Sequence, residues 1–159
     1  MTSRISHIEI DDAGPATTDP DIEREWQVAV DDLLEENTFA LLPREGQDAP
    51  AGPYRLRLAI QDGRLVFVVF CEDDSPAREF HLSLGPFRQV VKDYFRICES
   101  YYDAVKSLSS RRVEAIDMAR RGIHDEGASI LQERLEDKAS LDKDTARRLF
   151  TLICALQRG

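Results

Sequence analysis

The middle of the chain alternates apolar and polar residues with a period of two, the pattern of half-buried β-strands. Residues 54–61 and 78–84 follow this alternation, and residues 64–71 between them are apolar on both faces, as in a central strand. Asp62-Gly63 separates the first two of these segments and predicts a tight hairpin turn, because such a turn needs positive φ angles at both central residues. The pattern therefore predicts three antiparallel strands in a meander.

Elsewhere the apolar positions follow a helical period, apart from one short strand. Residues 4–10 place two isoleucines two positions apart and predict a strand that joins an edge of the sheet. Helices are expected over residues 20–37 and in three segments after Gly85, the last of which starts near Asp142. The order β-α-β-β-β-α-α-α predicts an α+β fold, in which about four helices pack with a small antiparallel sheet.

Length and composition favour one domain over residues 1–159. The hydrophobic fraction of 42% in a chain of 159 residues is enough for a sizeable core. No stretch approaches the roughly 20 apolar residues that span a bilayer, and the first residues lack the apolar run of a signal peptide. We therefore expect a cytoplasmic protein without membrane contact.

The three cysteines, Cys71, Cys98 and Cys154, are scattered singly among apolar neighbours. A structural zinc site usually takes its four ligands from paired motifs, which this spacing does not provide. We expect free, buried thiols, with neither a metal nor an organic cofactor.

The net charge of -9 is unevenly distributed. Residues 1–53 hold 13 acidic and 3 basic residues, whereas residues 54–159 hold 17 acidic and 18 basic residues. Binding of nucleic acid is not expected, because affinity for phosphate polymers comes largely from net cationic contacts. A local basic patch in the second half could still bind a small anion.

The first helix is amphipathic and carries most of the acidic residues on one side. Glu25, Asp32 and Glu35 are predicted to point outward, opposite the face that includes Trp26 and Leu33. This acidic face is a candidate docking surface for a protein partner.

A second candidate site is the segment DMARRGIHDEG, residues 117–127. On a helix, Asp117, Arg121 and His124 lie on one face, and Arg120 neighbours His124. Asp117 can orient the guanidinium of Arg121, and Arg121 with a protonated His124 could hold a phosphate or carboxylate.

The alternative interpretation of this segment is an ordinary solvated helix face, on which ion pairs contribute only about 0.3–0.5 kcal/mol. Gly122 and Gly127 each cost about 1 kcal/mol in a helix interior relative to alanine. Such glycines indicate close helix packing, a bend or the approach of a ligand to the backbone, and close packing is favoured.

Four blocks of the chain are similar to a known family. DIEREWQVAVDDLLEENTFA, LSLGPFRQVVKDYFRICESYYDAV, EAIDMARRGIHDEGASIL and DTARRLFTLICAL together resemble the uncharacterised UPF0262 family of alphaproteobacterial proteins. The resemblance covers nearly the whole chain and implies a bacterial cytoplasmic setting, but no activity.

The leading functional hypothesis is a non-enzymatic interaction or regulatory module that binds a protein partner. The alternative is a small enzyme or anion-binding protein that uses Arg120, Arg121 and His124. The two differ in whether Arg121 and His124 line a concave pocket with buried polar partners or point into solvent.

Overall fold

The computed structural model describes residues 3–11, 20–44, 46–107 and 110–157. The elements in chain order are β1 (Ile5–Asp11), α1 (Pro20–Glu35), β2 (Phe39–Leu41), β3 (Tyr54–Gln61), β4 (Arg64–Cys71), β5 (Pro76–Ser83), α2 (Gly85–Lys106), α3 (Ser110–Arg134), β6 (Ala139–Leu141) and α4 (Lys143–Gln157). The predicted α+β class and order of the main elements are confirmed. Two strands of three residues, β2 and β6, are additional.

The main sheet has four strands in the order β1-β3-β4-β5. β3, β4 and β5 form the predicted antiparallel meander, and β1 joins its edge as expected. β1 runs parallel to β3, a direction that the local pattern of residues 4–10 could not reveal.

The hairpin between β3 and β4 has the predicted two-residue turn. Gln61 pairs with Arg64, and the residues between them have positive φ angles of 52° at Asp62 and 73° at Gly63. Positive φ at both central residues is the condition for the type of turn that the sequence indicated.

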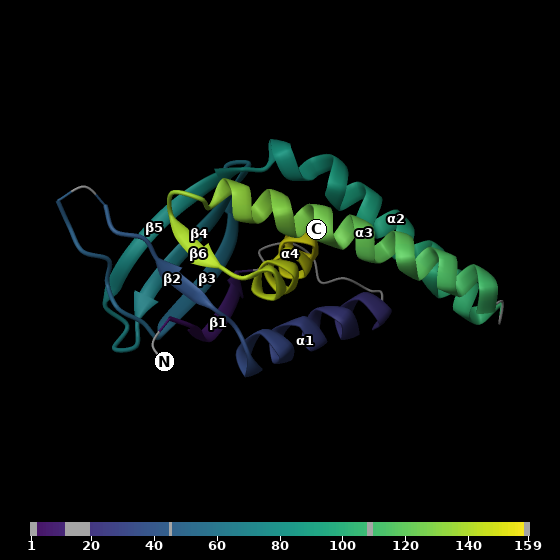
Figure 1. Cartoon of the computed structure of the whole chain (residues 1–159), viewed down its shortest axis with the longest axis horizontal. Coiled ribbons are helices and arrows are strands. Elements are labelled where there is room, and N and C mark those ends of the chain that lie inside the picture. The colour runs from purple at the N-terminus through teal and green to yellow at the C-terminus, as the bar shows by residue number, and fades with distance from the viewer. Residues whose placement is uncertain (1–2, 12–19, 45, 108–109, 158–159) are drawn as a thin grey trace.

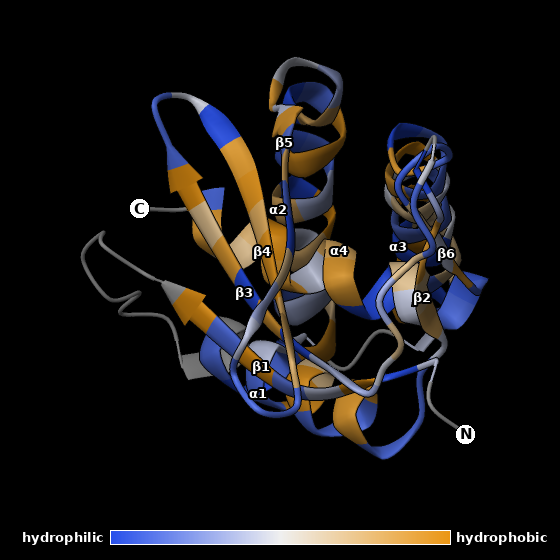
Figure 2. Ribbon diagram, turned by 90° about the vertical axis from the view of Figure 1, so that its left-hand side faces the viewer, coloured by the Kyte–Doolittle hydropathy of each residue, from blue (hydrophilic) through white to orange (hydrophobic). Residues whose placement is uncertain are grey.

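One face of the main sheet packs on the helices and forms the core. Figure 2 shows the sheet in front of α2 and α4, with no helix of the described residues in front of it. Leu56, Leu58 and Phe67 on the covered face are at most 2% exposed, and they belong to the same cluster as Phe87 of α2 and Phe150 of α4. On the opposite face, Arg57 and Gln61 are exposed, whereas Ala59 and Val66 are each only 2% exposed.

α4 is the central helix and packs against α1, α3 and β3. The helical spacing of Ala146, Leu149, Phe150 and Ile153 in the sequence predicts one apolar face, and all four residues are fully buried. β2 and β6 pair with each other beside this helix, in a second, two-stranded antiparallel sheet.

α2 and α3 pack side by side as a long hairpin. The end of this hairpin, where α2 stops and α3 starts, lies farthest from the sheet (Figure 1). No helix among the described residues is long and apolar enough to cross a membrane.

Candidate functional site

The charged segment 117–127 lies in the middle of α3. Asp117 pairs with Arg120 at 2.9 Å and with Arg121 at 3.1 Å. Side chains three and four residues apart are neighbours on a helix, which brings these groups together. The predicted pairing of Asp117 with Arg121 is confirmed, and Arg120 shares the same carboxylate.

Arg120 turns from α3 toward α1 and α2. Its guanidinium lies 3.8 Å from a carboxylate oxygen of Glu25 and 4.3 Å from the centre of the Tyr101 ring, a cation–π contact. Burial alone would lower the pKa of Arg120, but the charge of Glu25 and the bond to Asp117 outweigh it and raise the pKa. The charge of Arg120 is thus balanced by two carboxylates of the protein itself.

Glu25 of α1 is the acceptor at the centre of this cluster. Tyr94 and Tyr102 of α2 both donate their hydroxyl groups to its carboxylate, Tyr102 at 2.7 Å, and the Cys98 thiol lies 4.0 Å away. Tyr94, Cys98 and Tyr102 follow one another at a spacing of four residues, which places them on one face of α2. We call Glu25, Tyr94, Cys98, Tyr102 and Arg120 the Glu25 cluster.

The prediction that Glu25 points outward is wrong. Its side chain is only 26% exposed, whereas Asp32 and Glu35 are exposed as expected. A signal was present in the sequence: Glu25 lies four and eight residues before Ala29 and Leu33, which are both buried. The candidate acidic docking surface therefore lacks Glu25. Binding of a partner by Asp32 and Glu35 stays a prediction.

The thiol and the two phenol groups of the Glu25 cluster are held in their uncharged forms. Burial, reinforced by the negative charge of Glu25, raises the pKa of Cys98 to about 12 and that of Tyr94 further above its usual value. Burial and the hydrogen bond to Glu25 also raise the pKa of Tyr102. A thiol that stays protonated is a poor nucleophile, so the cluster does not have the electrostatics of a reactive cysteine.

His124 points to a different neighbour, helix α4. Its Nε2 lies 2.8 Å from the carbonyl oxygen of Arg147 and 2.9 Å from the hydroxyl of Thr151. Because a carbonyl only accepts, Nε2 carries the proton and donates it. The ring also packs near Tyr94 and Phe150, and burial lowers the pKa of His124, which favours the neutral imidazole.

Three of the four residues of the candidate anion site therefore meet, because Arg120 and Arg121 both pair with Asp117, whereas His124 is bonded to α4. The side chain of Arg121 is 79% exposed, and Arg120 belongs to the Glu25 cluster. An imidazole that is directed at α4 is not placed to act beside Arg121 as a second cation. Anion binding by these residues stays a prediction, and their arrangement does not favour it.

The two glycines of α3 differ. A Cβ atom on Gly127 would lie 2.3 Å from the ring of Phe150, so close packing against α4 is confirmed there. Gly122 is exposed, and a Cβ atom at this position would meet nothing within 4 Å. The close-packing interpretation of Gly122 is wrong, because this side of α3 faces away from the other helices.

The space beside the Glu25 cluster is very small. A cavity of about 10 Å³ is lined by Glu25, Trp26, Tyr94, Phe95, Cys98, Thr151, Cys154 and Ala155. This is about the room that one water molecule needs, and no substrate would fit without movement of the helices. The cluster is therefore suited to holding α1, α2 and α3 together.

A much larger hollow lies near the distal end of the α2–α3 hairpin. This groove has a volume of about 530 Å³ and is lined by Tyr101, Val105, Ser110, Val113, Glu114 and Asp117. Val105 is 43% exposed, and Met118 of α3 is 71% exposed. The distal hairpin thus leaves apolar side chains without cover from the rest of the described residues.

Comparison with known proteins places the chain among uncharacterised relatives. The model of the uncharacterised protein family UPF0262 matches residues 2–158. The chain belongs to the UPF0262 family. UPF0262 proteins of Roseobacter denitrificans and Cereibacter sphaeroides are 66% and 65% identical to it, each over 99% of both chains. A UPF0262 protein of Ruegeria pomeroyi is 63% identical over 99% of this chain and 98% of its own.

No solved structure matches this UPF0262 protein. The names of these relatives state no activity.

Proposed function

We propose that this UPF0262 protein is a non-enzymatic interaction module that binds an acidic, amphipathic helix of a partner protein in the groove of the α2–α3 hairpin. The observation that carries the proposal is the groove of about 530 Å³ at the distal end of the hairpin, with apolar side chains from both helices. Grooves of this kind accept the apolar face of a helix.

The arrangement of the reactive groups supports a non-enzymatic role. Cys98, Tyr94 and Tyr102 are directed at Glu25, and His124 is directed at Arg147 and Thr151. A general acid or base must reach a substrate proton through a hydrogen bond or through one water molecule. The adjoining cavity of about 10 Å³ gives a substrate no room for such contact.

The charge around the groove favours an acidic partner. Two acidic residues, Glu114 and Asp117, line the groove, and Asp117 is already paired with Arg120 and Arg121. The basic residues that favour an acidic partner lie next to the groove. Lys106, Arg111 and Arg112 are all exposed where α2 ends and α3 begins. Opposite charges across an interface accelerate association and discriminate against wrong partners.

A pair of synthetic amphipathic helices tests the proposal. Both peptides carry leucines on one face, flanked by glutamates in one peptide and by lysines in the other. We expect the glutamate peptide to bind at least roughly tenfold more tightly, because like charges at the groove oppose the lysine peptide. NMR chemical-shift changes of ¹⁵N-labelled protein should map to Tyr101, Val105 and Val113.

Two matched variants locate the binding surface. Val105→Asp should weaken binding of the glutamate peptide by roughly tenfold, since it places a like charge at the apolar groove. Val28→Asp makes the same change on exposed α1, where Val28 is 51% exposed, and should leave binding unchanged. Equal affinity for both peptides, or no shift changes at the groove, would overturn the proposal.

A further inference from the structure

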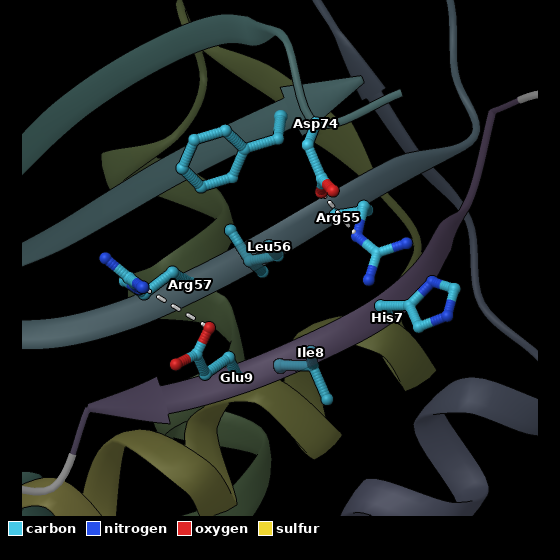
Figure 3. Close-up of a pocket in the computed structure, with 8 residues that line it drawn as sticks. His7, Ile8, Glu9, Arg55, Leu56, Arg57 and Asp74 are labelled. Carbon is cyan, nitrogen blue, oxygen red and sulfur yellow. Dashed lines mark hydrogen bonds and ion pairs between the residues drawn. The ribbon is translucent and has the colours of Figure 1, made fainter. Parts of the chain in front are cut away.

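A second hollow, of about 390 Å³, lies at the edge of the main sheet on strands β1 and β3. It is lined by His7, Ile8, Glu9, Arg55, Leu56, Arg57, Phe70 and Asp74, and we call it the sheet basin. Figure 3 shows its charged side chains, which come from β1, β3 and the turn after β4. The volume is within the range of about 300–1,000 Å³ that is usual for small-molecule sites.

Strand register brings the charged groups together. His7 and Glu9 of β1 are the partners of Arg55 and Arg57 of β3, and Arg55 is paired on its other side with Phe70 of β4. Because side chains two residues apart in a strand share a face, both arginines point to the face of the sheet that the helices do not cover. The basin thus combines guanidinium groups with a phenyl ring.

Two carboxylates orient the two guanidinium groups. Arg57 lies 3.4 Å from Glu9, and Arg55 lies 3.0 Å from Asp74 in the turn after β4 (Figure 3). The carboxylate side chains are 68% and 74% exposed, respectively. Exposed ion pairs contribute little to stability, so a ligand can replace these contacts at low cost.

We propose that the sheet basin binds a small zwitterion with an apolar side chain, of the class of α-amino acids. The ligand carboxylate would bind Arg57 and its ammonium group would bind Glu9, while Arg55 and Asp74 keep their own ion pair. A purely anionic ligand would be attracted by the arginines but repelled by both carboxylates, so only a ligand with both charges matches the lining. Phe70 offers an apolar surface to the ligand side chain.

Three ligands with the same ring and different charges test this proposal. L-phenylalanine carries both charges, 3-phenylpropanoate only the negative one and 2-phenylethylamine only the positive one. Isothermal titration calorimetry should show that L-phenylalanine binds at least roughly tenfold more tightly than either analogue, since each analogue loses one charged hydrogen-bonding group. Equal affinity of all three, or no binding of L-phenylalanine, would overturn the proposal.

Conservative variants locate the site. Arg57→Gln and Glu9→Gln should each weaken binding of L-phenylalanine by roughly tenfold, because each removes the partner of one ligand charge. Arg64→Gln removes an exposed arginine at the far end of the β3–β4 hairpin and should leave binding unchanged. Circular dichroism confirms that each variant is folded. Undiminished binding by both folded basin variants would refute the assignment to the sheet basin.

Discussion

Gly127 and Gly122 lie on the same helix but have different surroundings. Gly127 faces Phe150, which is fully buried, whereas Gly122 is exposed and has open space where a side chain would start. Glycine has a low helix propensity at both positions, so the sequence alone predicts the same cost in stability for each. The difference comes from α4, whose position relative to α3 is a property of the tertiary structure.

The first prediction compares alanine at these two positions. Gly127→Ala should lower the free energy of unfolding by about 1–3 kcal/mol, because the added methyl group overpacks against the buried Phe150 ring. Gly122→Ala should raise it by up to about 1 kcal/mol, because alanine favours the helix and meets no neighbour there. Urea denaturation followed by circular dichroism measures both values. The same sign of change in the two variants would contradict this account.

The side chains of the Glu25 cluster mark the limit of residue-level prediction. In the sequence, Tyr94 and Cys98 continue the helical spacing of the apolar residues Val90 and Val91, which predicts a buried stripe, and both are buried. The sequence did not indicate that their polar atoms meet Glu25, which is about 70 residues earlier in the chain. Helical spacing gives the face of a residue within its own helix, but the facing helix is set by packing of the whole chain.

At the scale of elements, strong periodicity made the larger part of the fold predictable. The meander, its turn and the apolar face of α4 are where the pattern placed them. β2 and β6 were missed because three residues are too few to show an alternation. In the first half of α3, Val113 and Ile116 are only half-buried, because this end of the α2–α3 hairpin lies away from the sheet (Figure 1).

The hairpin turn between β3 and β4 gives the second prediction. Gly63 has a φ angle of 73°, and a Cβ atom there would meet nothing within 4 Å, so the cost of a substitution comes from the backbone alone. Gly63→Val should lower the free energy of unfolding by roughly 1–3 kcal/mol, because a β-branched residue resists positive φ. Thermal and urea denaturation measure the loss.

Gly63→Asn is the matched control for this turn. Asparagine tolerates the left-handed region much better than valine, and the open space accepts its side chain equally well. We expect Gly63→Asn to retain most of the stability that Gly63→Val loses. If the two variants were equally destabilised, the side chain rather than the backbone angle would be the cause.

At the scale of the whole molecule, the Glu25 cluster connects α1 to the hairpin of α2 and α3. α1 packs chiefly on α4 and β1, while α2 packs chiefly on α3. The carboxylate of Glu25 joins these two parts, because it accepts hydrogen bonds from α2 and pairs with Arg120 of α3. This connection helps to fix the hairpin, and with it the proposed binding groove, relative to the body.

The last prediction tests this connection. Glu25→Ala should lower the free energy of unfolding by about 1–3 kcal/mol, because it removes the acceptor of the largely buried Tyr94 hydroxyl. Asp32→Ala removes an exposed carboxylate from the same helix and should change stability by less than about 0.5 kcal/mol.

A double-mutant cycle tests the link through Tyr102. Tyr102→Phe should cost less stability in the Glu25→Ala protein than in the parent, since the two side chains share one hydrogen bond. Urea denaturation of the four proteins of this cycle gives the coupling energy, and additive losses would show that Glu25 does not connect α1 to the hairpin through Tyr102.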